Sequence, residues 1–239
     1  MASRYDGRVS TSERAVDVLA GLRPQPYGFG RAERIKDPIV EPQWTGIRVL
    51  AAVDGDSVVV RDEAGDIVAE RPEVRRALAD AVRAGSVILD GFLTKDAVRD
   101  NLELLPAVEV PTAGQLLAKP FIGMRRDRLK ELEQRRERLR EAARFADDEI
   151  VVFMATDLLY LDEQSLLDVP LLERKRLLDS VIAESELVRV GAFVRPPIET
   201  WVTSWRRLGF FGLAFRAANS RYHPGEERDE WTTAPMPRR

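Results

Sequence analysis

Few side chains in this chain could act as a nucleophile or hold a metal ion. Its 239 residues include no cysteine and one histidine, which removes thiolate chemistry, disulfides and a histidine metal cluster. That residue, His223, lies in a Tyr-His-Pro-Gly turn, where an exposed turn residue is favoured over a catalytic one. Amine nucleophiles are limited to the lysines, which are Lys36, Lys95, Lys119, Lys130 and Lys175.

One arginine and two acids are candidates for binding a phosphate-bearing ligand. Arg48 carries a planar fork that suits phosphate or a ribose hydroxyl, and pairing with a carboxylate is an equal alternative. Asp90 and Asp157 could hold Mg²⁺, which commonly binds one or two carboxylates together with substrate phosphates. The alternative is that both acids orient turns.

The stretch Glu41-Pro42-Gln43-Trp44-Thr45-Gly46-Ile47-Arg48 resembles the Glu-Pro-Lys-Trp-Asp-Gly-x-Arg signature of the ATP-dependent DNA ligase family. In that family the lysine attacks the α-phosphate of ATP and carries AMP as a phosphoramidate. Gln43 stands in the lysine's place, and a carboxamide nitrogen has no basic lone pair for such an attack. The family's aspartate is replaced by Thr45, whereas Gly46 and Arg48 are retained.

Two later segments resemble the same family, in the family's order. Residues 87–92 are similar to a strand that ends in Leu-Asp-Gly-Glu, with Asp90 retained and the glutamate replaced by Phe92. Residues 155–162 are similar to the family's Phe-Asp-Leu-Leu-Tyr-Leu-Asp run, and Thr156 replaces the aromatic residue that stacks on adenine. The resemblance therefore implies that a metal- or ribose-binding acid and a stacking ring are missing.

The last matches lie near the end of the chain. Residues 211–216 resemble Glu-Gly-Val-Val-x-Lys, with Phe211 in place of the metal-binding glutamate and Arg216 in place of the lysine. An arginine keeps the charge, so phosphate contact is conceivable there. The two lysines that close the family's domain fall on Thr233 and Pro235.

The resemblance covers about residues 37–231 and implies an α+β fold with two packed, mainly antiparallel sheets and flanking helices. The nucleotide-binding candidates that it implies are Gly46, Arg48, Asp90 and Arg216, with no residue assigned to catalysis or to a metal. ATP and Mg²⁺ are implied by the resemblance alone, because a fold does not prove an activity.

Framework positions are retained while chemical positions are lost. We therefore expect a ligase-like domain, related to DNA repair and recombination ligases, that does not adenylate and acts as a nucleotide-binding, DNA-binding or scaffold module. The alternative is an active ligase or AMP transferase with a non-standard nucleophile. Lys36, seven residues before Gln43, is the candidate that the sequence offers for it.

Composition limits the partners. The net charge of −3 argues against a uniformly basic nucleic-acid binder, so DNA contact requires a local patch. No apolar run reaches the ~18 residues needed to cross a membrane, and residues 1–6 lack the apolar core of a signal peptide. We therefore expect a cytoplasmic protein without membrane contact.

The local patch is an Arg-rich helix predicted over residues 124–145. Between Arg125 and Arg144, nine basic residues face five acidic ones. The helix is interpreted as a solvated surface helix with self-paired charges, as a helix that tracks DNA phosphates, or as a partner-binding helix. The DNA-binding candidates are Arg135, Arg136, Arg138 and Arg140.

Periodicity predicts the remaining elements. Residues 1–36 are expected to form a polar tail or arm, residues 37–231 the ligase-like domain, and residues 232–239 a short tail. Strands are predicted at 48–53, 57–61, 86–93, 150–155 and 187–193, and helices at 12–22, 73–84, 171–183 and 198–210. In the last helix, the four-then-three spacing of Trp201, Trp205 and Leu208 predicts that these side chains point inward.

Overall fold

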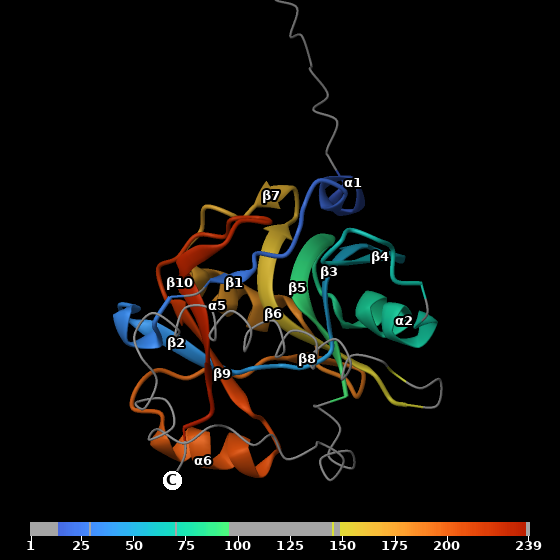
Figure 1. Cartoon of the computed structure of the whole chain (residues 1–239). Helices are drawn as coiled ribbons and strands as arrows, with labels where there is room; N and C mark the ends of the chain where they lie inside the picture. The colour runs from blue at the N-terminus through green and yellow to red at the C-terminus, as the bar shows by residue number, and fades with distance from the viewer. Residues whose placement is uncertain (1–13, 29, 70, 96–144, 146–148, 238–239) are drawn as a thin grey trace, which may run out of the picture.

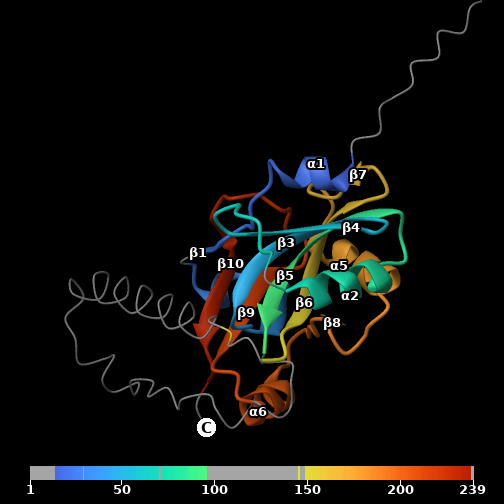
Figure 2. The same cartoon turned by 90° about the vertical axis from the view of Figure 1, so that its right-hand side faces the viewer.

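The computed structural model describes residues 14–28, 30–69, 71–95, 145 and 149–237. These residues form two packed β-sheets with flanking helices, shown in two views in Figures 1 and 2. The predicted fold, α+β with two mainly antiparallel sheets, is confirmed. The predicted Arg-rich helix lies outside the described residues, apart from Phe145.

The larger sheet has the strand order β4-β3-β5-β6-β7, and β8 pairs with β6 in parallel. Its strands are β3 Ile47–Asp54, β4 Ser57–Asp62, β5 Ser86–Thr94, β6 Val152–Leu161, β7 Gln164–Ser165 and β8 Val188–Val190. The predicted hairpin is formed by β3 and β4, which turn at Gly55 with a φ of +55°. β5 and β6 pair so that Asp90 stands opposite Asp157.

The smaller sheet has the order β1-β10-β9-β2. Its strands are β1 Tyr27–Gly28, β2 Pro38–Pro42, β9 Gly212–Ala217 and β10 Arg228–Pro235. β1 pairs in parallel with β10, and the other neighbours are antiparallel. Residues 232–235, predicted to begin a tail, continue β10, because the pairing with β9 runs on to Gly212.

Helices cover the sheets on different sides. They are α1 Ala15–Leu19, α2 Pro72–Ala81, α5 Leu171–Val181, α6 Glu199–Arg207 and the 3₁₀ turn η1 Ala32–Arg34. α2, which begins with Pro72 in its first turn, packs with the second half of α5 on the outer face of the larger sheet. Figures 1 and 2 both place α1 and α6 at opposite ends of the molecule. None of the helices in the described part of the chain has the length and apolarity needed to cross a membrane.

The inner faces of the two sheets meet in a core around Trp231. Leu50 and Ile88 of the larger sheet pack there with Trp231 of β10 and Leu19 of α1. The arm predicted for residues 1–36 is thus a packed arm over its described part, since α1 buries Ala15 and Leu19 completely.

α6 corrects one prediction about packing. Trp205 is buried, as predicted, but Trp201 and Leu208 are 47% and 43% exposed. Val202 takes the inward position, packing with Trp205 against the outer face of the smaller sheet. The helix spans nine residues rather than the thirteen of 198–210. Its buried residues are Val202 and Trp205, so the prediction was wrong for Trp201 and Leu208.

Candidate functional site

The turn between β2 and β3 carries the stretch that resembles the ligase signature. The backbone N–H of Gln43 donates to the carbonyl of Gly212 at 2.9 Å, which ties the turn to β9. Gly46 has a φ of +111°, and a Cβ there would overlap the carbonyl oxygen of Leu93. Glycine is therefore required at position 46 by backbone geometry and by close approach of β5.

Arg48 reaches from β3 to Asp90 of β5 as a bidentate ion pair. Its Nε and Nη2 donate to Oδ1 and Oδ2 of Asp90 at 3.1 and 2.7 Å, with 6% and 0% of the two side chains exposed. Burial alone lowers the pKa of Arg48, but the Asp90 carboxylate outweighs it and holds that pKa above its ordinary value. Arg48 is thus permanently charged and already paired.

The N-terminal arm and the segment after β9 supply further hydrogen-bond partners to Arg48 and Asp90. Arg48 Nη1 donates to the carbonyl of Gln25 at 2.6 Å, and the hydroxyl of Tyr222 donates to Asp90 Oδ2 at 2.7 Å. The backbone N–H of Gln25 donates back to the Tyr222 hydroxyl at 2.9 Å. Burial and the Asp90 charge raise the pKa of Tyr222 well above its usual value.

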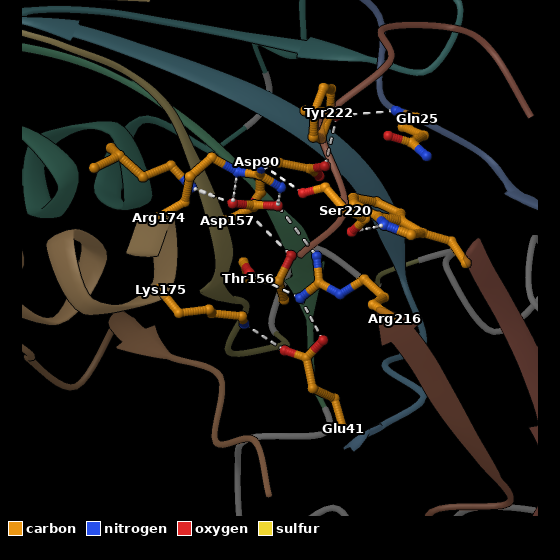
Figure 3. A network of polar contacts seen from close by, with 12 residues as sticks. Gln25, Glu41, Asp90, Thr156, Asp157, Arg174, Lys175, Arg216, Ser220 and Tyr222 are labelled. Carbon is orange, nitrogen blue, oxygen red and sulfur yellow. Dashed lines mark hydrogen bonds and ion pairs between the residues drawn. The ribbon is translucent and has the colours of Figure 1, made fainter. Parts of the chain in front are cut away.

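A second buried pair joins β6 to α5. Arg174 Nε and Nη2 donate to the two carboxylate oxygens of Asp157, both at 2.8 Å, and both side chains are fully buried (Figure 3). The backbone N–H of Leu158 adds a bond to Asp157 Oδ1 at 2.9 Å. Burial alone raises the pKa of Asp157, but Arg174 outweighs it and the net pKa is lowered.

Arg216 of β9 connects this pair to Glu41 of β2. Its Nη1 lies 3.3 Å from Asp157 Oδ2, and its Nη2 donates to the carbonyl of Thr156 at 3.0 Å and to Glu41 Oε2. The other Glu41 oxygen accepts Lys175 Nζ at 2.5 Å (Figure 3). Burial lowers the pKa of Lys175 despite the neighbouring Glu41 carboxylate.

Five of these side chains, Glu41, Arg48, Asp90, Asp157 and Arg216, lie buried together in one space between the two sheets. Among the described residues, this buried network holds four cations, Arg48, Arg174, Lys175 and Arg216, and three carboxylates, Glu41, Asp90 and Asp157. Each carboxylate is bound by at least one cation, and each cation binds at least one carboxylate.

The structure thus places three of the four nucleotide-binding candidates in this space, namely Arg48, Asp90 and Arg216, with Gly46 at the turn beside it. Phe92 lies under Arg48, with the guanidinium carbon 5.8 Å from its ring centre. Lys36 is exposed in the loop before β2. In the described part of the chain, no three His, Cys, Asp or Glu residues form a group that could hold a metal ion.

Sequence reasoning missed Arg174 and Lys175, although a signal was present. Leu171, Arg174, Lys175 and Leu178 follow the i, i+3, i+4, i+7 spacing of a buried helix face, and all four are buried. Two cations on an apolar stripe predict buried acidic partners, because an unpaired buried charge is very costly. Those partners are Asp157 and Glu41.

Comparison with known proteins agrees with this architecture. A family model described as "ATP dependent DNA ligase domain" matches residues 121–233. The "Multifunctional non-homologous end joining DNA repair protein LigD" of Mycobacterium tuberculosis is 28% identical over 215 residues, which are 90% of this chain and 22% of that protein. The DNA ligase of Thermococcus fumicolans is 26% identical over 229 residues, covering 90% of this chain and 37% of the relative.

Solved structures show the same fold. The ligase domain of M. tuberculosis LigD superposes with a TM-score of 0.57 at 23% identity, covering 90% of this chain and 59% of that one. A mycobacterial DNA ligase D complexed with ATP and MES gives the same TM-score at 24% identity. The chain is therefore a relative of the adenylation domain of ATP-dependent DNA ligases. It spans between about a fifth and just over a third of the length of the two curated relatives.

Proposed function

We propose that this chain is a ligase-type module that does not transfer AMP and that contributes binding, with DNA as its partner. Its similarity to DNA ligases, one of which is named as a DNA repair protein, supports DNA as the partner. The proposal rests on two features: the chain retains a ligase-type framework, and it has replaced the residues at the family's chemical positions. Nucleotide binding and a protein-scaffold role remain weaker readings of the same framework.

The residue types at the chemical positions support the loss of adenylation. Gln43 offers no amine, and Phe92 and Phe211 offer no carboxylate where the resemblance places metal-binding acids. Loss of the nucleophile and of the acids removes covalent and electrostatic contributions together, each commonly worth orders of magnitude in rate. A single restored residue therefore does not restore the reaction.

The observation that carries the proposal is that the two retained cationic positions are already neutralised by the chain itself. Arg48 is bound to Asp90, and Arg216 is bound to Glu41. For either arginine to turn toward a ligand phosphate, it would have to leave a buried carboxylate without its partner. Breaking a buried pair in this way costs about 3 to 5 kcal/mol.

Neither Mg²⁺ nor ATP fits these residues well. The carboxylates of Asp90 and Asp157 each face a bidentate guanidinium, which repels a second cation. Thr156, where the resemblance places a stacking ring, offers no aromatic face; base stacking on such rings is worth ~1 to 3 kcal/mol in single-strand binders. We expect isothermal titration to show ATP affinity weaker than micromolar, and micromolar or tighter binding would contradict this assignment.

DNA contact is assigned to the Arg-rich segment, whose helix lies outside the described residues. Its local basic excess suits phosphate contacts that do not depend on sequence. Fluorescence anisotropy with a labelled duplex would measure affinity over a series of salt concentrations. Replacing Arg135, Arg136, Arg138 and Arg140 by Gln should abolish binding at moderate salt and reduce the log–log salt slope by roughly 3 to 4 units.

A matched variant separates local contact from net charge. Replacing four exposed arginines elsewhere, Arg76, Arg83, Arg189 and Arg221, by Gln changes the charge by the same amount. This control should bind DNA nearly as the parent does. If the four Arg-rich replacements also left binding intact at low salt, the segment would be a self-paired surface helix and DNA would not be its partner.

A second candidate function, AMP transfer through another lysine, is favoured by one observation. Burial lowers the pKa of Lys175, so its neutral, nucleophilic form is more populated at a given pH than that of an ordinary lysine. Lys175 is nevertheless fully buried and bound to Glu41, so a nucleotide has no direct approach. Peptide mapping after incubation with labelled ATP decides this candidate, since it predicts label on the peptide that contains Lys175.

A further inference from the structure

Residues 96–148 connect two neighbouring strands of the larger sheet. β5 ends and β6 begins at the same end of that sheet, where Thr94 stands opposite Val152 (Figure 2). The chain therefore leaves the sheet and returns to it at one corner. The Arg-rich segment, residues 124–145, belongs to this connection. The contacts at the corner decide how the segment is joined to the domain.

An ion pair links the departing chain to the returning chain. Lys95, directly after β5, donates through Nζ to Glu149 Oε1 at 2.9 Å, and each side chain is 24% exposed. Partly buried pairs are screened by salt less than exposed ones, so this pair persists at the salt concentrations at which DNA binding is measured. It holds the two ends of the connection together.

Arg71 links the returning chain to α2. This residue directly precedes Pro72, and its Nη1 donates to the backbone carbonyl of Glu149 at 3.4 Å. Its guanidinium carbon lies 5.8 Å from the ring centre of Phe145, and its side chain is 13% exposed. A guanidinium over an aromatic ring is attracted more strongly as the pair loses contact with water. Arg71 thus contacts the returning chain at two points.

Phe145 is the last residue of the Arg-rich segment. It is partly buried and packs against the core on the outer face of the larger sheet. Contact with DNA phosphates requires cations, so an apolar ring at this position adds nothing to it. Its packing instead fixes the point at which the segment joins the domain. We call Arg71, Lys95, Phe145 and Glu149 the root of the segment.

We propose that the root positions the Arg-rich segment for DNA, with Arg71, Phe145 and Glu149 as positioning residues that act through the segment. This inference rests on the proposed function, in which the segment carries the DNA contacts. A segment held at its end loses less conformational freedom when it binds than one that is joined loosely. Freeing the root therefore weakens DNA binding although every arginine of the segment is retained.

Phe145→Ala tests the root without changing the charge. Fluorescence anisotropy with a labelled duplex should give a Kd at least roughly fivefold higher than that of the parent. The log–log salt slope should change by less than about one unit, because the cations that neutralise phosphates remain. The matched control Phe215→Ala removes a partly buried ring from the smaller sheet and should leave the Kd nearly unchanged. An unchanged Kd in folded Phe145→Ala protein overturns the proposal.

Glu149→Ala is the sharper variant, because net charge and positioning predict opposite results. Removing an acid makes the chain more positive, which by itself strengthens the attraction to DNA. The loss of the partner of Lys95 should instead raise the Kd at least roughly threefold. Glu173→Ala removes an acid from an exposed pair elsewhere and should not weaken binding. Equal or tighter binding by Glu149→Ala overturns the positioning role.

Hydrogen exchange without DNA gives a second readout, which keeps the proposal testable through Glu149→Ala if Phe145→Ala does not fold. A peptide covering residues 145–152 should exchange faster in both root variants, while a peptide covering residues 47–54 of β3 should not change. Weaker binding without faster exchange overturns the proposal. If the four-arginine variant loses DNA binding but both root variants keep it, the positioning role alone fails. If the four-arginine variant keeps DNA binding, the proposed function fails, and this inference with it.

Discussion

Glu41 and Arg216, which lie on adjacent strands of the smaller sheet, form a buried ion pair that also connects to the larger sheet through Asp157. Lys175 of α5 binds the other oxygen of Glu41. Two sheets and one helix therefore meet in a single charged network. Among the described residues Lys175 forms its ion pair with Glu41 and Arg174 forms its ion pair with Asp157, so removing either acid leaves a cation buried and unpaired.

Removing Asp157 should be strongly destabilising. Asp157→Ala leaves Arg174 fully buried without its carboxylate, and we expect a loss of about 3 to 5 kcal/mol in the free energy of unfolding. Urea unfolding followed by circular dichroism measures it. The control is Glu173→Ala, which breaks the exposed pair with Arg176 and should cost no more than about 1 kcal/mol. Equal effects of the two variants would show that the buried network is not a stability element.

Gly46 should tolerate no side chain. In Gly46→Ala the new methyl group meets the carbonyl oxygen of Leu93 at a φ of +111°, so strain and overlap add. Gly55→Ala also has a positive φ, but nothing lies within 4 Å of the added Cβ. We expect about 1 to 2 kcal/mol of destabilisation at Gly55, from the left-handed backbone alone, and a larger loss at Gly46. Thermal unfolding of both variants decides, and a smaller loss at Gly46 would contradict the geometry.

The two α6 tryptophans should differ sharply. Trp205 is 5% exposed and Trp201 is 47% exposed. Trp205→Ala should destabilise the protein by about 3 to 5 kcal/mol, as expected for a large core truncation, whereas Trp201→Ala should cost much less. Acrylamide quenching of the single-tryptophan-deleted proteins gives a second readout, because deleting Trp201 should remove the more accessible emission. Similar losses for the two variants would mean that α6 packs through the face predicted from its sequence, on which both tryptophans point inward.

Stability should fall at alkaline pH through Tyr222. Its folded pKa is raised, so the folded protein keeps a proton that the unfolded chain releases above about pH 10. Linkage then lowers the free energy of unfolding as pH rises through that value, by at most about 1.4 kcal/mol per pH unit for one proton. Tyr222→Phe should be less stable at neutral pH but should show a shallower alkaline decline.

Two other groups contribute to the same pH range and are common to parent and variant. Tyr27 has a raised pKa and adds decline in the same direction, while the lowered pKa of Lys175 adds a rise that ends near its unfolded value of about 10.4. The comparison therefore uses the difference between the two proteins, measured by urea unfolding from pH 8 to 11. A difference that does not change with pH would refute the assigned role of Tyr222.

Much of the framework could be predicted because it depends on local patterns. The hairpin of β3 and β4, the helix that begins at Pro72 and the strand of β5 all follow from periodicity and turn residues. The inward face of α6 could not be predicted, because Trp201 and Val202 are adjacent in sequence and the position of the sheet decides which of them is covered. Apolar spacing alone placed Trp205 correctly but placed Trp201 and Leu208 on the wrong side.

The site was predictable in part. The resemblance placed Arg48, Asp90 and Arg216 near one another, and the structure brings them into one space. It gave no indication that the arginines pair with the chain's own acids, because Glu41 and Arg216 are 175 positions apart in sequence. The role of Gln25 was equally hidden, since its contacts with Tyr222 and His223 depend on how the arm folds back.

The central claim, that this ligase-type domain does not adenylate, is tested most directly by intact-mass spectrometry. The parent and Gln43→Lys are each incubated with ATP and Mg²⁺, and their masses are compared with those before incubation. We expect no mass increase in either protein, because the variant regains the amine but neither the acids replaced by Phe92 and Phe211 nor arginines free of Glu41 and Asp90. An increase of one AMP in the parent would contradict the account.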